Sequence, residues 1–397
     1  MRVLAVHNRY QQAGGEDVVF AAEVELLRSY GHTVTELIFD NREIPERPAP
    51  LDAARLALGT VWSRKGAARV RAMIREHRPE VVHFHNTFPL VSPAAYYAAR
   101  AEGVAVVQTL HNYRLICPGS LLYRDGRVCQ DCVGRVVPWP GVLHGCYRGS
   151  RAQTAPVAAM VGAHRLGGTW RNLVDRYIVL SRVARDQFVA GGLPEDRIVI
   201  KPNFVELDLG ERSSPGEYYL YAGRLAAEKG VETLLRAWTE HGRREPLHIV
   251  GDGPLAPQVE AAAQVSPSIR YLGRLDRAAV LEQMRHARAL IFPSVWYEGF
   301  PMILVEALAS GLPVIASRLG AAAEIIEDGV TGLHFTAGSA DDLAAKVDWV
   351  SQHTEATAEM GRAARCTYEA KYTGARNHDQ LMAIYQAALE ESRRSHA

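Results

Sequence analysis

The sequence contains no uninterrupted apolar run of the roughly 18 residues that a membrane-spanning helix needs. Its first residues, MRVLAVHNRY, lead directly into a strand-like segment and lack the apolar core and small-residue cleavage site of a signal peptide. An excess of one charge is also absent, because 45 Lys and Arg against 44 Asp and Glu leave a formal net charge of +1. That balance gives no electrostatic reason to expect a nucleic acid partner. We therefore expect a cytoplasmic protein without a transmembrane helix.

Basic residues do cluster at one place. The stretch RKGAARVRAMIREHR (Arg64–Arg78) has six Lys and Arg residues against one Glu. A helix with a solvated basic face is the simpler interpretation, and the alternative is a surface that meets anionic lipid headgroups. A second segment, Ala155–Trp170, mixes apolar and basic residues and predicts either an acceptor-side or membrane-facing helix or an ordinary packed one. Peripheral contact with the inner face of a membrane is therefore an expectation to test.

The length and pattern of the chain predict two α/β domains. At 397 residues it exceeds one ordinary hydrophobic core, and 48% hydrophobic with 22% charged residues is the composition of a soluble globular enzyme. Short apolar segments alternate with helical patterns such as EDVVFAAEVELLRSYG, in which Val19, Ala22 and Leu26 share a face and Gly31 ends the helix. This alternation predicts parallel sheets covered on both faces. The expected strands are Val3–Val6, Thr33–Phe39, Val81–Phe84, Ala105–Thr109, Tyr177–Leu180, Arg197–Ile200, Tyr218–Tyr221, Leu247–Val250, Ile269–Leu272, Leu290–Phe292 and Pro313–Ala316.

The strand–loop–helix pattern opens each half of the chain, so the halves are expected to be Rossmann-like domains of similar size. We expect an N-terminal domain over residues 1–203 with a Cys-rich insertion at about 115–150, and a donor domain over residues 204–373. The join falls in the Pro-, Gly- and Ser-rich segment Lys201–Glu217, with a hinge near Phe204–Asp208. Residues 374–397 read as a final helix that packs back on the N-terminal domain.

Two basic residues follow the first strand of the second half. The segment YAGRLAAEKG places Arg224 and Lys229 five residues apart, just before a helix expected to begin near Val231. The free N–H groups and positive dipole end of a helix suit phosphate oxygens. A guanidinium together with an ammonium suits a diphosphate. Two surface residues of an ordinary strand–helix loop are the alternative.

Glycines near these loops favour the phosphate interpretation. VGDGP (Val250–Pro254) is a turn after the next expected strand, where Gly251 lets backbone approach a ligand closely. In the first half, Gly14 and Gly15 lie between a strand and a helix and could act in the same way from across a cleft. A plain turn is the alternative for this glycine pair.

Two carboxylates enclose an uncharged segment in YEGFPMILVE (Tyr297–Glu306). Proline suits the first position of a helix, so a helix is expected at about Pro301–Ala309, with Gly311 ending it. Glu298 then lies in the loop before the helix, and Glu306 lies inside it. A carboxylate on a mostly buried helix needs hydrogen-bond donors. A ribose diol would supply them to Glu306, and an internal salt bridge is the alternative.

In this order and at these spacings, GRLAAEKG, VGDGP and EGFPMILVEALASGLPVIAS resemble the retaining glycosyltransferases of family 4. The Gly14–Gly15 loop and TLHNYR also lie where that family would place them, so the resemblance covers nearly the whole chain. It implies an α/β protein of the GT-B fold, with two Rossmann-like domains whose parallel sheets face each other across a cleft. The implied activity is transfer of a sugar from a UDP- or GDP-sugar to a hydroxyl acceptor: a glycan, a lipid-linked saccharide or a natural product.

The resemblance also implies roles for the matching residues. The diphosphate of the donor is held by Arg224 and Lys229, and its ribose hydroxyls by Glu306. Glu298 contacts hydroxyls of the donor sugar, and His111 lies beside the reacting sugar at its 6-hydroxyl. Gly15 closes over the diphosphate. The implied donor-site residues are Gly14, Gly15, His111, Arg224, Lys229, Gly251, Glu298, Gly299, Phe300 and Glu306.

Two features bear on metals and on the acceptor. The sequence has no D-x-D motif, and Glu206-Leu207-Asp208 is the nearest substitute, so we expect fixed cations to fill the role of a catalytic metal. In VVHFHNTFPLVSP, His83 lies inside an expected strand and reads as a core histidine. His85 lies at the strand end and is the acceptor-site candidate, as a base for the incoming hydroxyl.

Four of the five cysteines are concentrated in the insertion, at the spacing C-x11-C-x2-C-x13-C: Cys117, Cys129, Cys132 and Cys146. In a cytosolic protein such clustering points to metal before disulfide, and four thiolates suit structural zinc. Reduced thiols packed in a loop, or disulfides in an oxidised preparation, are the alternatives. The insertion resembles one found in some bacterial polysaccharide-assembly members of the family.

Two other functions fit the same architecture. A GT-B sugar-nucleotide epimerase would need carboxylates and histidines placed for proton abstraction, and a catalytically silent protein would bind sugar nucleotides only. Incubation with UDP- and GDP-sugars separates these hypotheses. Slow hydrolysis indicates a transferase, isomerisation indicates an epimerase, and binding alone indicates a silent protein.

Overall fold

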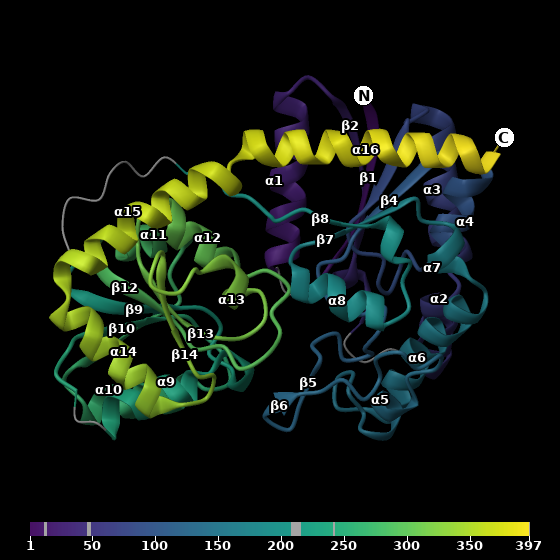
Figure 1. The fold of residues 1–397 in the computed structure, drawn as a ribbon. Coiled ribbons are helices and arrows are strands. Elements are labelled where there is room, and N and C mark those ends of the chain that lie inside the picture. The colour runs from purple at the N-terminus through teal and green to yellow at the C-terminus, as the bar shows by residue number, and fades with distance from the viewer. Residues whose placement is uncertain (12–13, 46–48, 208–215, 241–242, 397) are drawn as a thin grey trace. The chain divides into compact units, whose positions relative to one another are not determined.

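The computed structural model describes residues 1–11, 14–45, 49–207, 216–240 and 243–396. Its contacts divide the chain into two units (Figure 1). The first comprises Met1–Leu122, Cys129–Asn203 and Asn377–Ala397, and the second comprises Tyr123–Val128 and Phe204–Arg376. The expected hinge at Phe204–Asp208 stays a prediction, and Asp208 lies outside the described residues.

A six-stranded parallel sheet with the order β2-β1-β3-β4-β7-β8 forms the centre of the first unit. Its strands are β1 (Arg2–Arg9), β2 (Thr33–Asp40), β3 (Val81–Phe84), β4 (Ala105–Thr109), β7 (Arg176–Val179) and β8 (Ile198–Ile200). The helices are α1 (Gly15–Ser29), α2 (Pro50–Val61), α3 (Arg64–His77), α4 (Ala94–Ala101), α5 (Trp139–Leu143), α6 (Arg151–Leu166), α7 (Thr169–Asn172), α8 (Arg182–Ala190) and the final helix α16 (Gly374–His396).

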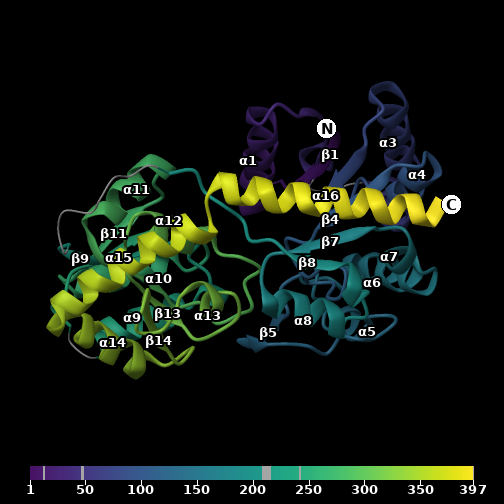
Figure 2. The same ribbon diagram turned by 45° about the horizontal axis from the view of Figure 1, so that its top comes forward.

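One face of this sheet carries an unusual set of polar side chains. Side chains two residues apart on a strand share a face, and Val81 and Val107 belong there to one hydrophobic cluster with residues of α1 and α16. Figures 1 and 2 show these two helices next to the sheet. The same alternation directs His83 and Thr109 toward these two helices. Beyond the strand ends, His85 continues the same series. Because side chains alternate between the two faces of a strand, these polar groups all lie on the face of the sheet that α1 and α16 cover.

The second unit repeats the plan with the strand order β11-β10-β9-β12-β13-β14, again all parallel. Its strands are β9 (Tyr218–Ala222), β10 (Leu247–Val250), β11 (Ile269–Gly273), β12 (Ala287–Phe292), β13 (Val314–Ser317) and β14 (Gly332–Phe335). The helices are α9 (Val231–Thr239), α10 (Ala256–Val265), α11 (Arg277–His286), α12 (Met302–Ala309), α13 (Ala322–Ile325), α14 (Ala340–Gln352) and α15 (Thr354–Lys371). Hydrophobic clusters cover both faces, which explains the nearly continuous apolar strands.

The predicted fold class, two α/β halves with parallel sheets, is confirmed. Strand β14 was not expected, because Gly332 weakens the strand signal. A Cβ atom at Gly332 would lie only 2.0 Å from the carbonyl oxygen of Val314, so the close backbone contact requires glycine. The short antiparallel hairpin β5 (Tyr123–Arg124) and β6 (Arg127–Val128) in the insertion was not expected either.

Candidate functional site

The loop between β9 and α9 carries Arg224 and Lys229, and close backbone contacts fix it on two sides. Gly230 has φ +70°, and a Cβ atom there would lie 1.8 Å from the carbonyl oxygen of Pro293. Gly251 has φ +144°, and a Cβ atom there would lie 1.8 Å from the carbonyl oxygen of Gly223. Both glycines are therefore required by backbone packing inside the unit, whether or not a ligand approaches them.

Lys229 is paired with one of the two predicted carboxylates. Its Nζ lies 2.8 Å from Oε2 of Glu298 and 5.7 Å from the ring centroid of Trp296. Glu298 is 7% exposed, and within the described ranges its Oε1 has no hydrogen-bond partner. Arg224 is exposed, and its guanidinium forms no hydrogen bond or ion pair with any described residue. The β9–α9 loop thus holds one paired and one unpaired cation, and the β12–α12 loop adds a buried acceptor atom that has no donor among the described residues.

Glu306 lies on α12, which begins at Met302 with Pro301 as its N-cap. Its Oε1 accepts a hydrogen bond of 3.1 Å from Arg277 of α11. Burial raises the pKa of Glu306, and Arg277 offsets part of that rise. The salt bridge expected as the alternative is therefore formed. Contact with ribose remains a prediction.

Backbone donors lie beside Glu298 in the same loop. The N–H groups of Gly299 and Phe300 donate no hydrogen bond to any described residue. Partly buried N–H groups without acceptors are uncommon in folded proteins. They are suited to hydroxyl or phosphate oxygens.

The topology explains why these loops come together. Strand order reverses between β9 and β12, and the Arg224–Lys229 loop follows β9 while Glu298 follows β12. Ligands of open α/β sheets bind at the carboxyl ends of strands beside such a reversal. The first unit has its reversal between β1 and β3, and His85 follows β3.

In the first unit, Gly14 is the N-cap of α1 and Gly15 is its first residue. Asp17 accepts a 2.8 Å hydrogen bond from the Gly14 N–H, and its other carboxylate oxygen lies 2.8 Å from Nε2 of His7. A Cβ atom at either glycine would meet nothing within 4 Å. Backbone crowding therefore does not require this glycine pair.

His111 contacts the acceptor-site candidate directly. Its Nε2 lies 3.1 Å from Nδ1 of His85, which is 3% exposed. His83 has a partner at each ring nitrogen, because Nδ1 lies 2.8 Å from the Tyr385 hydroxyl and Nε2 lies 2.8 Å from Oγ1 of Thr109. His83 is thus the satisfied core histidine that was expected.

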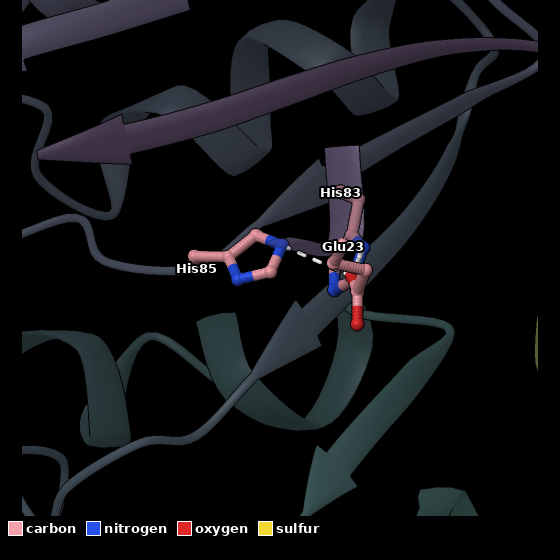
Figure 3. Close-up of side chains that lie close together, drawn as sticks. All are labelled: Glu23, His83 and His85. Atoms are coloured by element: carbon pink, nitrogen blue, oxygen red, sulfur yellow. Dashed lines mark ion pairs between the residues drawn. The ribbon is translucent and has the colours of Figure 1, made fainter. Parts of the chain in front are cut away.

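A buried ion pair lies behind these histidines. Oε1 of Glu23 on α1 lies 3.2 Å from Nδ1 of His83 and 3.3 Å from Nε2 of His85 (Figure 3). Its Oε2 accepts a 2.9 Å hydrogen bond from Nζ of Lys201. Burial alone would raise the pKa of Glu23, but Lys201 and the two histidines hold it well below its usual range. Glu23 is therefore an anion that the fold neutralises with a lysine.

In the described part of the chain, Glu23, His83 and His85 are the one group of three or more ligand-type residues whose ligand atoms lie within 4.8 Å of one another. This group does not fit a metal ion. Lys201 places a positive charge 2.9 Å from Glu23, and both nitrogens of His83 already have partners. An added cation would be repelled by the ammonium.

Sequence reasoning did not single out Glu23 or Lys201, although a signal for Glu23 was present. Val19, Glu23 and Leu27 follow one another at intervals of four residues on α1, so a carboxylate interrupts the apolar stripe of the helix. Lys201 gave no comparable signal. It is 1% exposed because β8 ends just before it on the covered side of the sheet.

The four insertion cysteines lie near one another without forming a closed ligand set. Burial first, and then the neighbouring thiols of Cys117, Cys146 and Cys129, raise the pKa of Cys132 to about 12. No three of these sulfur atoms lie within 4.8 Å of one another, although all four residues are described. A tetrahedral zinc site with Zn–S bonds of about 2.3 Å would draw the thiolates closer than this.

The basic stretch forms α3, and several of its charges have partners. Arg71 and Arg75 both pair with Glu102, at 3.4 and 2.9 Å, and Arg69 lies over the ring of Phe39. Ala155–Trp170 falls largely on α6, a helix with several buried apolar residues. No helix in the described ranges is both long enough and apolar enough to cross a membrane.

Two family models match the chain, one in each half. The model described as Glycosyltransferase Family 4 matches residues 13–209, and the model described as Glycosyl transferases group 1 matches residues 216–353. Together the two matches cover most of both units.

Characterised relatives match over part of their length. Glycogen synthase of Mycobacterium tuberculosis is 34% identical over 160 residues, which are 39% of this chain and 38% of the relative. The D-rhamnosyltransferase WbpZ of Pseudomonas aeruginosa is 29% identical over 177 residues, which are 44% of this chain and 46% of the relative. The chain therefore spans less than half the length of these relatives.

Solved structures match over nearly the whole chain. The structure of Anabaena HepE in complex with UDP has a TM-score of 0.69 at 17% identity and covers 98% of this chain and 100% of its own. The apo form of the lipopolysaccharide outer core galactosyltransferase WaaB has a TM-score of 0.63 at 18% identity, with 100% of both chains covered. At such identities the likeness concerns the fold.

Proposed function

The chain belongs to glycosyltransferase family 4, and from this premise we propose that it transfers a sugar from a nucleoside diphosphate sugar to a hydroxyl acceptor with retention at the anomeric carbon. The observation that carries the proposal is the pair formed by Lys229 and Glu298. Arg224, whose guanidinium has no partner among the described residues, is on the same loop as Lys229, and Glu298 has a buried oxygen for which those residues supply no donor. This arrangement suits a ligand with an anionic end and a hydroxyl-bearing end.

Each group has a task that matches its chemistry. Arg224 and Lys229 bind the diphosphate, and the N–H groups of Gly299 and Phe300 add donors nearby. The free oxygen of Glu298 accepts from a hydroxyl of the donor sugar. Further binding residues in this proposal are Glu306 at the ribose, Gly251 at the nucleotide, Gly14 and Gly15 at the diphosphate, and His111 at the sugar.

During the proposed transfer step, negative charge develops on the diphosphate that Arg224 and Lys229 bind. The bond from the anomeric carbon to the diphosphate oxygen breaks, and a bond from the acceptor oxygen to that carbon forms on the same face. The acceptor proton passes to the departing phosphate oxygen. Fixed cations stabilise the growing negative charge on the diphosphate more than they stabilise the bound donor, so Arg224 and Lys229 lower the barrier without a divalent metal.

The donor in this proposal is a UDP- or GDP-sugar, and UDP-glucose is the first to test because HepE has been solved with UDP and with UDP-glucose. The acceptor is a glycan, a lipid-linked saccharide or a small natural product. His85, expected from the sequence as the base for its hydroxyl, is 3% exposed and has a side chain at each ring nitrogen, so this proposal assigns the acceptor proton to the departing phosphate instead. Exposed apolar residues on α2, Leu51 and Leu58, with the basic helix α3, support peripheral contact with an anionic membrane surface.

Structural zinc in the insertion is a separate part of the proposal. The influence of Cys117, Cys146 and Cys129 on the pKa of Cys132 supports it, because this influence requires the four thiols to lie in one region, and metal binding removes the thiol protons and draws the sulfurs together. Metal analysis of protein purified under reducing conditions should find about one zinc per chain. Protein without zinc whose four thiols all titrate would contradict this part alone.

The central experiment is incubation of the purified protein with UDP- and GDP-sugars. Slow release of free nucleoside diphosphate and sugar of unchanged anomeric configuration is expected. Isomerisation of the donor would indicate an epimerase, and binding without turnover would indicate a silent binding protein. The variant Lys229→Met is expected to abolish release, because it removes the cation that binds the leaving diphosphate.

A further inference from the structure

A continuous chain of contacts leads from a buried lysine to His111. Lys201 contacts Oε2 of Glu23 at 2.9 Å, and Oε1 of Glu23 lies 3.3 Å from Nε2 of His85. Nδ1 of His85 then lies 3.1 Å from Nε2 of His111. All four residues belong to the first unit, and Lys201, Glu23 and His85 are at most 3% exposed.

The chemistry of each contact fixes where the protons lie. Burial first, and then the charge of His83, lower the pKa of His85 to about 3, so its ring is neutral and carries one proton. Oε1 of Glu23 makes no aligned hydrogen bond with any described residue, so its 3.3 Å contact with Nε2 of His85 is an electrostatic one. A carboxylate has only acceptor lone pairs, so a bare Nε2 at this distance would set a lone pair against them, whereas a protonated Nε2 presents a positive edge. The proton of His85 therefore lies on Nε2, and its Nδ1 is an acceptor.

The same reasoning carries one residue further. Burial and the neighbouring His85 hold the pKa of His111 well below its usual range, so this ring is neutral as well. Because Nδ1 of His85 accepts, Nε2 of His111 must donate across the 3.1 Å contact. Nδ1 of His111 is then left as a hydrogen-bond acceptor.

We propose that Glu23, held by Lys201, is a positioning residue that acts through His85 to fix His111 as the Nε2-protonated tautomer, with its Nδ1 available to accept from a hydroxyl of the donor sugar. The role of this acceptor in transfer rests on the proposed function, whereas the arrangement of protons does not. The final helix supports the chain of contacts, because Oδ1 of Asn377 accepts a 2.9 Å hydrogen bond from Lys201.

The proposal makes a specific prediction for Glu23→Gln. An ammonium has only donors, so the amide oxygen of the new side chain would face Lys201 and its NH₂ would face His85. Nε2 of His85 must then accept, its proton moves to Nδ1, and Nδ1–H donates to His111. The tautomer of His111 inverts, and its free nitrogen becomes a donor.

Nitrogen-15 NMR of protein labelled in its histidine rings tests this directly, since protonated and bare ring nitrogens have distinct shifts. The signals of His111 are assigned by their loss in His111→Asn. In the native protein both His85 and His111 should be neutral and protonated on Nε2. A proton on Nδ1 of His111 overturns the proposal, and this measurement requires no turnover.

In Glu23→Gln the proton of His111 should move to Nδ1, and kcat should fall about 10- to 100-fold while the donor KM changes little, as is typical when the partner that orients a functional histidine is lost. An unchanged tautomer or an unchanged kcat overturns the proposal. If no donor is turned over by the native protein, the proposed function fails, and the NMR result still decides the arrangement of protons.

Asp175→Asn is the matched control. Asp175 is fully buried in the same unit and accepts 2.9 Å and 2.8 Å hydrogen bonds from Arg100 and from the Val106 N–H. This variant also loses a buried carboxylate, so it should lose stability while keeping the tautomer of His111 and kcat. An equal fall in kcat in both variants would mean that Glu23 acts only through stability and would overturn the positioning role.

Discussion

Lys229 and Glu298 form an ion pair with 2.8 Å between Nζ and Oε2, and the second oxygen of Glu298 has no partner among the described residues. A buried acceptor atom without a donor is costly, so this oxygen is available to a hydroxyl group of a bound ligand. Glycines lock the loop of Lys229 to its neighbours, so the cation is held in place before a ligand arrives. Preorganised charge of this kind favours catalysis over mere binding.

Glu298→Gln should lower kcat about 100- to 1,000-fold with a smaller effect on donor affinity, the usual cost of removing one preorganised polar group at a reacting centre. The change also leaves Lys229 without its carboxylate. Steady-state kinetics with the active donor sugar give kcat and KM separately. Glu282→Gln, at an exposed ion pair on α11, is the control and should behave as wild type. A KM effect alone for Glu298→Gln would place this residue in binding rather than transfer.

Glu306→Ala should weaken binding of the nucleoside diphosphate about 10- to 100-fold, because a hydrogen bond to a charged group contributes about 1.5–3 kcal/mol. Calorimetric titration with UDP and with GDP measures this effect. Its salt bridge with Arg277 is half exposed on the arginine side, so the loss of that pair alone should have little effect on folding. Arg277→Ala is the control for the lost pair, and equal weakening in both variants would argue against ribose recognition by Glu306.

Arg224→Met should weaken binding of the nucleoside diphosphate about 10-fold or more while leaving binding of the free nucleoside unchanged, because in the proposed site the guanidinium contacts only the phosphates. Titrations at several salt concentrations should show a shallower salt dependence for the variant than for wild type. Loss of nucleoside binding as well would show that the substitution distorts the loop. Arg244→Met is a control outside the site loop, on the segment before β10.

The free energy of unfolding should fall as the pH is lowered below about 6.5. His85 has its pKa lowered to about 3 by burial and by His83, and the pKa of His111 is lowered as well, so both rings stay neutral in the folded chain. The unfolded chain takes up protons near the ordinary histidine pKa of 6.5, so it binds more protons and gains stability relative to the fold. The cost is about 1.4 kcal/mol per pH unit for each proton taken up.

Urea denaturation between pH 7.5 and 5 measures this slope. The carboxylate of Glu23 does not interfere, because the pKa of Glu23 is held well below its ordinary value of 4.5 and that value itself lies beneath the window. His85→Gln should reduce the slope by about one proton. Parallel pH profiles for the variant and the native protein would contradict the neutral state of His85 in the fold.

Much of the second unit could be predicted from the sequence because its signals are local. The boundaries of Leu247–Val250 follow from a short apolar run, and the start of α9 at Val231 follows from the glycine before it. The turn VGDGP is different. From the sequence, its glycines are predicted to let the backbone approach a ligand closely. The structure shows that they are also required for close contact with the neighbouring loop. That second reason depends on which strands are adjacent, which local patterns do not state.

The sequence by itself determined the two α/β halves and the loop positions of Arg224, Lys229 and Glu298, because strand and helix periodicity and turn residues act over a few neighbours. Only the tertiary structure decided that Lys229 pairs with Glu298, that Arg277 pairs with Glu306, and that Glu23 and Lys201 lie behind His85. Glu23 and Lys201 are separated by 178 positions along the chain. They form an ion pair because the parallel sheet brings segments that are distant in sequence beneath one helix. Both charges are buried there, and a buried charge without a partner would be strongly destabilising.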